Sequence, residues 1–550
     1  MSVRVGYILL SLAAAHASTH KIVVDTSRHV SLTDEIYACV NFDLWPSSKC
    51  DYGNCPWGES GLFNLPLENK SIVKAMQAFE NKVHLRIGGS LQDFVVYNAT
   101  ENLYCTYADF SEPTNTTKIG YEYFSGCLSN QRWDELNSFC NNAGCDIIFG
   151  INALYGRTPP DYSLCPSETN CHIAGEDDCC TNWSGGPWDN NNARAFMQYT
   201  YDRSYNIYAY QFGNELVGDK GIETHLTVDE YAEDWVLFVD TLNSVYSGQK
   251  KVHKPLTVVP DTTFQAEWYG EFLKLLGAGK NAAVYAPDVV SHHLYSMGAG
   301  VNSQAWAVAL NVTVLDQVVA LGKEVRSVVD TTSKGSKIWV GEGGGCYNSG
   351  ANNVTNAFNS GFWWLDQLGA FARQGHGAYC RQAFIGGYYS LLDPTSFIPN
   401  PDYYTLLTWS RIMGAAVLDV SHTTADTNIR SYAHCTSKDS QSYVPGSISV
   451  VLINLSNTTT VDVEISGFAT SPSDTRKEFI FSSACGADDE RTLLACREVL
   501  LNGLFVKTGA EGDIPSMEPK ITAGMGSTVT MHPLTYGFVV FDHARAPACH

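Results

Sequence analysis

The sequence predicts a (β/α)8 TIM barrel followed by a C-terminal antiparallel β-sandwich domain. Eight short apolar runs, most of them rich in β-branched or aromatic residues, alternate with longer segments between residues 37 and 388. After about residue 415 the helical spacing stops, and strand-like stretches follow one another between turn residues. The chain has 550 residues, which is too long for one ordinary core and accommodates two domains.

The barrel is expected from strands that alternate with helices. Trp133–Phe139 and Val228–Val245 carry apolar residues three and four positions apart, which predicts helices between the apolar runs. This alternation is typical of a TIM barrel with long loops. The expected barrel strands are Tyr37–Phe42, Val83–Ile87, Asp146–Ile151, Ile207–Phe212, Leu256–Val259, Val289–Leu294, Ile338–Val340 and Ala383–Tyr388.

The second domain is expected from alternating apolar and polar residues. Ser447–Asn454 and Thr459–Ile465 predict a hairpin that turns at Ser456-Asn457, and Tyr536–Phe541 predicts a further strand. Lys21–Val24 predicts a strand before the barrel, which we expect to join the second domain. The expected division is a signal peptide at 1–17, the N-terminal strand segment at 18–35, the catalytic barrel at 36–414 and the β-sandwich at 415–550.

The N-terminus has the pattern of a secretory signal peptide. Arg4 precedes the apolar stretch Val5–Ala15, and Ala15-His16-Ala17 fits the small-residue cleavage rule. No later run is long and apolar enough to span a bilayer, so we expect no transmembrane anchor. The expected location is secreted, in the extracellular space or cell wall, with a lysosome or vacuole as the alternative. Glycosylation sequons stand at Asn69, Asn98, Asn115, Asn182, Asn311, Asn353, Asn454 and Asn457.

The cysteine usage agrees with export. There are 17 cysteines, and such density in an exported chain indicates disulfide bonds, with at least one thiol left over. Zinc is the alternative for Cys179-Cys180, but no second cysteine or histidine pair stands at zinc-finger spacing. The clusters are Cys39/Cys50/Cys55, Cys105/Cys127/Cys140/Cys145 and Cys165/Cys171/Cys179/Cys180.

The net charge disfavours polyanionic partners. The chain carries a formal charge of −22, so nucleic acid is not expected as a partner, because phosphate binding needs clustered Lys and Arg. The same charge argues against a long, highly sulfated polysaccharide as the preferred substrate. Nothing in the sequence requires a cofactor or a metal.

Two glutamates follow strands on opposite sides of the expected barrel. Glu215 follows the fourth strand in Gly213-Asn214-Glu215, and Glu342 closes the seventh. Residues at the C-terminal ends of barrel strands face the active site, although a single such glutamate could be a solvated turn residue. Two of them suit a retaining glycosidase, with Glu342 as nucleophile and Glu215 as general acid/base. Asn214 can hydrogen-bond the 2-hydroxyl of the sugar.

Further motifs are distributed along most of the chain. They are Trp45-Pro46, Lys49-Cys50-Asp51-Tyr52-Gly53, Cys55-Pro56-Trp57-Gly58, Leu85-Arg86-Ile87-Gly88-Gly89-Ser90-Leu91-Gln92-Asp93, Arg132-Trp133-Asp134-Glu135-Leu136, Phe149-Gly150, Asn152-Ala153-Leu154, Phe212 to Leu216, His292-His293 with Tyr295, Gly341-Glu342, Tyr347-Asn348-Ser349-Gly350, Arg381-Gln382, Leu501-Asn502-Gly503 and Ile514-Pro515. Together they resemble the heparanase-like family, glycoside hydrolase family 79, and most of all its plant-type branch.

The resemblance implies a retaining mechanism at Glu215 and Glu342. It implies substrates with β-linked glucuronic acid or its 4-O-methyl form, and Tyr295 as the partner of the nucleophile. A buried structural carboxylate and a core tyrosine are the alternatives for two of the implied positions, Asp43 and Tyr389, and hydrogen bonding is favoured over metal binding for His292-His293. The implied sugar contacts are Asp43, Ser90, Tyr295, Gln382 and Tyr389.

Two departures from the family pattern stand beside these matches. Residues 159–186 form a cysteine-rich insertion where the family is usually shorter, and it follows the third strand on the active-site face. Gly343 replaces a residue that is often serine. The insertion puts the preference for the leaving group in doubt.

The glycine-rich loop after the nucleophile suggests how a uronate is recognised. A lysine at the sugar carboxylate would also attract Glu342, whereas backbone N–H groups and tyrosine hydroxyls donate without a formal charge. We therefore expect the carboxylate to bind the loop at 343–350, through Gly344, Gly345 and Gly350, together with the hydroxyls of Tyr295 and Tyr389. The alternative is that the glycines form only a flexible turn.

Three functions remain open on the sequence. The first is a secreted exo-acting β-glucuronidase on glycans or glycoconjugates, whose partner is a carbohydrate that contains glucuronic acid. The second is an endo-β-glucuronidase of heparan-type polysaccharide, which the acidic charge disfavours. The third is a non-catalytic carbohydrate-binding relative, against which the presence of Glu215, Glu342, Asn214 and Tyr295 argues.

Overall fold

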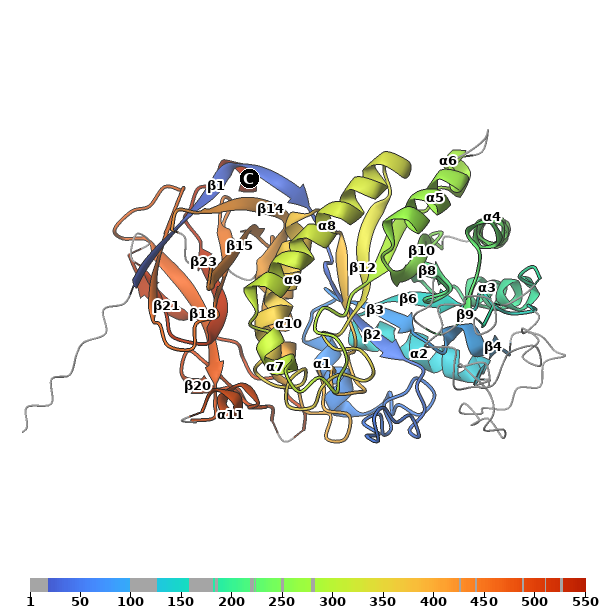
Figure 1. Ribbon diagram of the computed structural model, residues 1–550, viewed down its shortest axis with the longest axis horizontal. Helices are drawn as coiled ribbons and strands as arrows, with labels where there is room; N and C mark the ends of the chain where they lie inside the picture. Colours follow the sequence, from blue (N-terminus) through green and yellow to red (C-terminus); the bar gives the residue numbers. More distant parts are fainter. Residues whose placement is uncertain are drawn as a thin grey trace, which may run out of the picture.

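A computed structural model shows the arrangement of the chain in two parts (Figure 1). A barrel with surrounding helices forms one part, and a sheet of C-terminal strands forms the other. The structure describes residues 18–98, 126–157, 182–183, 186–217, 222, 224–248, 252–277, 282–424, 427–440, 443–486, 489–509, 511–524 and 528–550. The expected signal peptide, Cys105 and nearly all of the insertion at 159–186 lie outside these residues.

Eight parallel strands close the barrel. The closed order follows the chain, so each strand pairs with the next one along the sequence and the last pairs with the first. Both parts of the predicted fold class are therefore confirmed, since a predominantly antiparallel sheet follows this barrel. The barrel strands are β2 (Ala38–Asp43), β3 (His84–Gly88), β6 (Asp146–Ile151), β8 (Ile207–Phe212), β10 (Leu256–Thr263), β11 (Val289–His293), β12 (Lys337–Gly343) and β13 (Ala378–Arg381).

The eighth strand differs from the expected one. We expected it at Ala383–Tyr388, but the pairing strand is β13, and 383–388 is a buried loop that follows it. Gly386 and Gly387 have φ angles of +103° and +69°, which take this apolar run out of the extended conformation. The true strand is short and contains the charged Arg381, which concealed it from a search for apolar runs.

Helices surround the barrel and pack on its strands. The two helices predicted from apolar spacing are present as α2 and α4, and a capping box of Thr227 and Glu230 begins α4. The other helices from α1 to α9 lie in segments between barrel strands, α10 follows the last barrel strand, and α11 belongs to the second part. The helices are α1 (Lys70–Gln77), α2 (Asn130–Ala143), α3 (Asn191–Asp202), α4 (Val228–Val245), α5 (Ala266–Leu276), α6 (Ala282–Tyr285), α7 (Ala305–Val308), α8 (Val312–Thr332), α9 (Ser360–Arg373), α10 (Pro401–Ile412) and α11 (Glu490–Leu494).

Eleven strands form the second part. Alternate residues of these strands meet in a separate apolar core, while the opposite face packs against the helices of the barrel. The strands are β1 (Ser18–Leu32), β14 (Met413–His422), β15 (Ile429–Thr436), β16 (Ile448–Asn454), β17 (Val461–Ser466), β18 (Thr475–Ser483), β19 (Val499–Leu501), β20 (Leu504–Phe505), β21 (Lys520–Ala523), β22 (Val529–Met531) and β23 (Thr535–Phe541).

The expected hairpin at Ser456-Asn457 is wrong. Its two strands exist as β16 and β17, but β16 pairs with β15 and β23, and β17 pairs with β1 and β22. All seven residues of β16 are buried, so this strand lies in the interior of the sheet with a neighbour on each edge. An alternating pattern predicts that a segment is a strand, but it does not specify the partner.

The N-terminal strand lies inside the second sheet. β1 pairs antiparallel with β14 and parallel with β17, and it contains the strand expected at Lys21–Val24. In Figure 1 it is the blue strand that runs among the orange strands of the other end of the chain. Ile22 and Val24 are buried in the core of this sheet. The two ends of the chain therefore build one sheet.

We expect residues 415–550 alone not to fold. Without β1, β14 and β17 lose the strand between them, and each exposes an unpaired edge and part of an apolar core. Thermal unfolding of this fragment, followed by circular dichroism, should show no cooperative transition, whereas the full chain should unfold cooperatively. A cooperative transition in the isolated fragment would contradict the expectation.

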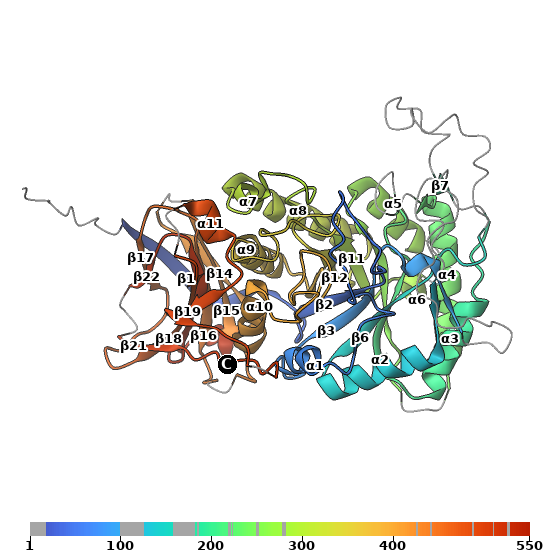
Figure 2. The same ribbon diagram turned by 90° about the horizontal axis from the view of Figure 1, so that it is seen from below.

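Helices α9 and α10 join the two parts. Both Figure 1 and Figure 2 show them between the barrel and the second sheet. All residues of α9 from Ser360 to Ala372 are buried, because the helix is covered on both sides. Across this contact the buried Asp366 accepts hydrogen bonds from Arg430 and Tyr432 of β15.

Disulfides link strands and loops in both parts. Cys39–Cys380 joins β2 to β13 where the barrel closes, and Cys435–Cys549 ties the C-terminus to β15. Cys127 is also disulfide-bonded. Among the described cysteines one is free, the buried Cys346. The remaining described disulfides are Cys50–Cys55, Cys140–Cys145 and Cys485–Cys496.

The expected glycosylation sites differ in exposure. Asn311, Asn353 and Asn457 are exposed, and Asn69 and Asn98 are half-buried. Asn454 is fully buried, and its amide nitrogen donates to three backbone carbonyls, so the folded chain has no room for a glycan there. Asn115 and the side chain of Asn182 lie outside the described residues.

Within the described residues, no helix has both the length and the apolarity that crossing a membrane requires.

Candidate active site

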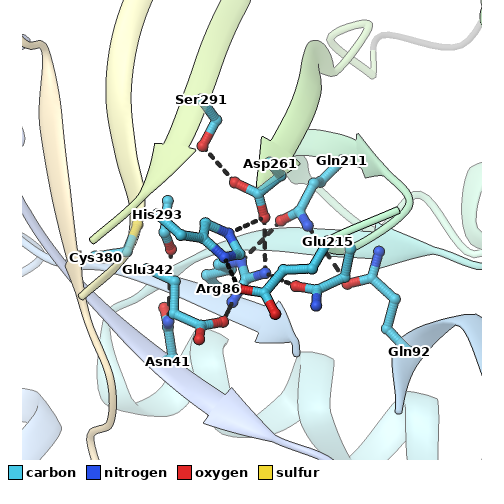
Figure 3. A network of polar contacts seen from close by, with 12 residues as sticks. Asn41, Arg86, Gln92, Gln211, Glu215, Asp261, Ser291, His293, Glu342 and Cys380 are labelled. Atoms are coloured by element: carbon cyan, nitrogen blue, oxygen red, sulfur yellow. Dashed lines mark hydrogen bonds and ion pairs between the residues drawn. The ribbon is translucent and has the colours of Figure 1, made fainter. Parts of the chain in front are cut away.

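The two predicted glutamates meet at the C-terminal end of the barrel. Glu342 belongs to β12, and Glu215 lies three residues after the end of β8. One carboxylate oxygen of each glutamate and a ring nitrogen of His293 all lie within 4.8 Å of one another (Figure 3). Glu342 is buried, and the Glu215 side chain is slightly more accessible. The site therefore holds two carboxylates that face one another across a short gap.

Arg86 is the central cation of this site. Its guanidinium donates to Glu342 at 2.9 Å and to Asp261 and Asn214 at 2.7 Å each, and its Nε donates to Gln211 at 2.8 Å (Figure 3). The side chain is 1% exposed, so these bonds satisfy a fully buried charge. Arg86 thereby fixes the Glu342 carboxylate and the Asn214 amide relative to each other.

His293 connects Glu215 to a second buried carboxylate. Its Nδ1 lies 2.8 Å from Glu215, and its Nε2 lies 3.0 Å from Asp261. Burial alone would lower the pKa of His293, but Asp261, Glu342 and the bond to Glu215 raise that pKa to about 10. His293 is therefore a cation at neutral pH.

The charge of Asp261 is stabilised by these neighbours. Burial alone would raise its pKa, but Arg86 and His293, together with a hydrogen bond from Ser291, hold the pKa of Asp261 below its usual range. Asp261 thus stays ionised and balances two adjacent cations. With both ring nitrogens of His293 beside carboxylates, the histidine holds Glu215 in place, although the three ligand atoms could also reach a common cation.

The turn that carries the acid/base candidate has an unusual backbone. Glu215 has a φ of +54°, a conformation that residues with a side chain rarely adopt. Hydrogen bonds hold the turn: the N–H of Glu215 donates to the carbonyl of Asp261, and the N–H of Asn214 donates to the Asp93 carboxylate. Burial raises the pKa of Asp93 to about 7, against the lowering effect of its hydrogen bonds and of Arg86.

The predicted partner of the nucleophile contacts it directly. The Tyr295 hydroxyl donates to the second oxygen of Glu342. Burial and the charge of Glu342 both raise the pKa of Tyr295 well above its ordinary value, so the hydroxyl keeps its proton. Glu342 therefore receives one donor on each oxygen, from Tyr295 and from Arg86.

Asp43, Gln382 and Tyr389 form a second group beside Glu342. Gln382 donates to Asp43 at 2.6 Å, and the same amide lies 3.4 Å from the Tyr389 hydroxyl. Burial, reinforced by the charge of Glu342, raises the pKa of Asp43 to about 7. All three side chains are less than 5% exposed. They place hydroxyl, amide and carboxyl groups on one side of the nucleophile.

The glycine loop after Glu342 packs against the two tyrosines. A Cβ atom on Gly344 would lie 2.9 Å from the Tyr389 ring and 3.0 Å from the Tyr295 ring, so only glycine fits between them. Gly350 has a φ of +78° and lies against the backbone of Tyr389. Arg381 donates to the Tyr389 carbonyl and pairs with the buried Asp402, which fixes the backbone of Tyr389.

Some buried polar atoms in the site have no protein partner among the described residues. They are Nδ2 of Asn214, Oε1 of Gln382 and Oδ1 of Asn41. Buried polar atoms in folded proteins are nearly always hydrogen-bonded, and exceptions often mark ligand sites. One donor and two acceptors are thus available to a polyhydroxylated ligand.

The structure brings most of the predicted residues together. Ser90 lies in the loop after β3, one residue beyond Gly89, whose backbone packs on the Asp43 carboxylate. Gly345 lies against the Trp363 ring, where it too leaves no space for a side chain. The polar side chains of Glu215, Glu342, Asn214 and Tyr295 join one network around Arg86 and His293. His292, in contrast, points away to His376 at 3.0 Å.

Sequence reasoning gave no role to Arg86, Asp93 or Asp261. Arg86 and Asp93 stood in a recognised motif, and Asp261 follows the apolar run of the fifth strand at the barrel end that carries the site. In the structure Arg86 lies within β3, Asp93 lies in a short helix after that strand, and Asp261 lies near the end of β10. Arg86 is a cation that binds Glu342 directly, and Asp261 pairs with the same guanidinium.

Comparisons with known proteins found a family model and curated relatives that match this chain. The model of the glycosyl hydrolase family 79 N-terminal domain matches residues 19–369. The chain is 36% identical to heparanase-like protein 2 of Arabidopsis thaliana, over 96% of this chain and 95% of the relative, and 31% identical to the baicalin-beta-D-glucuronidase of Scutellaria baicalensis, over 93% and 90%.

A solved structure is also similar in fold. It is a 4-O-alpha-L-rhamnosyl-beta-D-glucuronidase from Fusarium oxysporum, with a TM-score of 0.61 at 13% identity, covering 95% of this chain and 100% of that one. This likeness supports the two-part fold, and the sequence matches support the resemblance seen in the motifs.

Proposed function

Because this chain belongs to glycosyl hydrolase family 79, we propose that it is a secreted retaining β-glucuronidase that releases glucuronic acid from glycans or glycoconjugates. Glu342 is the nucleophile and Glu215 the general acid/base. The observation that carries the proposal is the short gap between the two carboxylates, since one oxygen of Glu215 lies within 4.8 Å of one oxygen of Glu342. Retaining glycosidases have carboxyl groups about 5–5.5 Å apart, whereas inverting enzymes leave about 6.5–9.5 Å for a water.

In the proposed double displacement each of these groups has a task. Glu342, oriented by Arg86 and Tyr295, attacks the anomeric carbon and forms a glycosyl-enzyme ester. Glu215, oriented by His293, gives its proton to the leaving oxygen and then takes one from the attacking water. The free Nδ2 of Asn214 can donate to the sugar 2-hydroxyl.

Recognition of the uronate is proposed to use uncharged donors. Two buried arginines at this end of the barrel are already engaged, Arg86 with carboxylates of the network and Arg381 with Asp402. The Tyr389 hydroxyl accepts a hydrogen bond from the Gln382 amide, and among the described residues its own proton has no acceptor. The loop at 343–350 packs against Tyr389, and Gly344 brings bare backbone between the rings of Tyr295 and Tyr389.

Replacement of Tyr389 by phenylalanine tests this pocket. The variant should lose one hydrogen bond to a charged acceptor, which lowers kcat/KM on an aryl β-glucuronide by on the order of 1.5–3 kcal/mol, about 10- to 150-fold. The loss on the matching β-glucoside should be much smaller. Tyr403→Phe is the control, since that buried hydroxyl donates to the Ala75 carbonyl outside the site. Equal losses on both substrates would contradict the pocket.

A substrate panel tests the function itself. The purified chain is assayed with aryl β-glucuronide, β-glucoside and β-galactoside, and with heparan sulfate followed by size-exclusion chromatography. We expect turnover of the glucuronide, with the first product in the β configuration by NMR. Preference for the glucoside, or an α first product, would reject the proposal. Shortening of the polymer would instead select endo-action, the second of the functions left open by the sequence.

A further inference from the structure

We propose that Asp93 is a positioning residue that holds the Asn214–Glu215 turn in its catalytic conformation. The inference rests on the proposed function, because it assigns Glu215 as the acid/base. Among the described residues, Asp93 makes no hydrogen bond to either catalytic carboxylate. It acts on the backbone, one residue before Glu215.

The contacts of Asp93 use both carboxylate oxygens. Oδ2 accepts the N–H of Asn214 at 2.8 Å, and Oδ1 accepts the N–H of Ala153 at 2.7 Å. Asn214 follows β8 and Ala153 follows β6, so one side chain joins the ends of two neighbouring barrel strands. Asp93 is 2% exposed in the short helix η1 (Gln92–Phe94), which keeps water from competing for these two bonds.

The turn needs this support. Gly213 and Glu215 both have positive φ angles, +70° and +54°, and Asn214 lies between them. A residue with a side chain adopts this conformation only where the surroundings impose it. The neighbouring N–H groups of Gly213 and Glu215 donate to backbone carbonyls, those of Ile151 and Asp261. Of these three backbone N–H groups, only that of Asn214 donates to a side chain. A point substitution at Asp93 can therefore remove this bond, whereas it cannot remove the bonds to backbone carbonyls.

A purely structural carboxylate is the competing explanation. Asp366 is such a group: it is 0% exposed and binds Arg430 and Tyr432 where α9 meets the second sheet. Loss of a structural carboxylate lowers stability and the amount of active enzyme for every substrate alike. Loss of a group that acts through Glu215 should affect the proton transfer selectively.

The test compares leaving groups. In Asp93→Asn one of the two N–H groups faces an amide NH2 instead of an oxygen, whichever way the amide turns. Because displacement of a catalytic group by about 1 Å can cost on the order of 100-fold, we expect kcat/KM to fall by about 10- to 100-fold on a glucuronide with a basic alcohol as leaving group. The dinitrophenolate of a dinitrophenyl glucuronide leaves without a proton, so the loss of kcat/KM on this substrate should stay within about threefold. Asp93→Glu, which keeps the charge but displaces it, should show a weaker loss with the same pattern.

Two comparisons decide the outcome. Asp366→Asn, the matched buried carboxylate, should lower the melting temperature without any dependence on the leaving group. Asp93→Asn combined with Glu215→Ala should be no slower than Glu215→Ala alone, because both act on the same proton transfer. Equal losses on both leaving groups, or additive losses in the double variant, would overturn the role of Asp93. If Glu215→Ala itself shows no dependence on the leaving group, the proposed function fails instead.

Discussion

Replacing Glu342 with alanine is expected to reduce kcat/KM on an aryl β-glucuronide by on the order of 10⁵-fold or more. Without this carboxylate no glycosyl-enzyme ester forms, and the remaining groups of the site can only bind the sugar. The fold should survive the change, because Asp261 still neutralises Arg86 at 2.7 Å. The measurement is steady-state kinetics on the purified variant together with its thermal unfolding.

Azide identifies the position of the lost group. In the cavity left by Glu342→Ala, azide can attack the anomeric carbon from the same face, so activity on an activated substrate should return in part. The product should be the α-glycosyl azide, which NMR distinguishes from the β form. Glu478→Ala is a suitable control, since Glu478 is a buried, ion-paired glutamate in β18 of the second sheet. Near-normal rates for Glu342→Ala would mean that another residue is the nucleophile.

Replacing Glu215 with alanine should give the second largest effect, and one that depends on the substrate. General acid catalysis contributes about 10²–10⁴-fold, so kcat/KM on a glucuronide with a poor leaving group should fall by that factor. A dinitrophenyl glucuronide needs no proton for departure, and its kcat/KM should fall by less than about tenfold. The measurement is a plot of log kcat/KM against the pKa of the leaving phenol, which should be steep for the variant and shallow for the native enzyme.

The contrast between the two variants is the decisive result. If Glu215 and Glu342 have the roles proposed, only Glu215→Ala spares good leaving groups, and azide added to it should give the β-glycosyl azide, because the ester on Glu342 still forms. A loss at Glu215 that is equal for all leaving groups would exclude it as the acid/base. His293 would then become the alternative proton donor, because it lies 2.8 Å from Glu215.

The sequence determined the fold class and the two catalytic candidates. Seven of the eight barrel strands overlap the predicted runs, and α4 has the predicted limits, Val228–Val245. Such elements are readable because the periodicity of apolar residues is a local property of the chain. Glu215 and Glu342 were readable for the same reason: each follows or ends an apolar strand, and in a barrel all such ends meet on one face.

Only the tertiary structure decided which segments are neighbours. It placed β1 between β14 and β17, separated the two strands of the expected hairpin, and moved the eighth strand to Ala378–Arg381. Hydrogen bonds between strands are made by the backbone, which is the same in every residue, so the pattern of side chains indicates a strand without indicating its partner.

The network around Arg86 was likewise decided by the tertiary structure. Arg86, Asp261 and His293 come from three separate strands, β3, β10 and β11, and each alone would be an unfavourable buried charge. Their function depends on the 2.7–3.0 Å contacts that bring opposite charges together, and these contacts arise only when the barrel closes. The sequence specified the residues of most strands; the closed barrel decided which of them hold Glu215 and Glu342 in place.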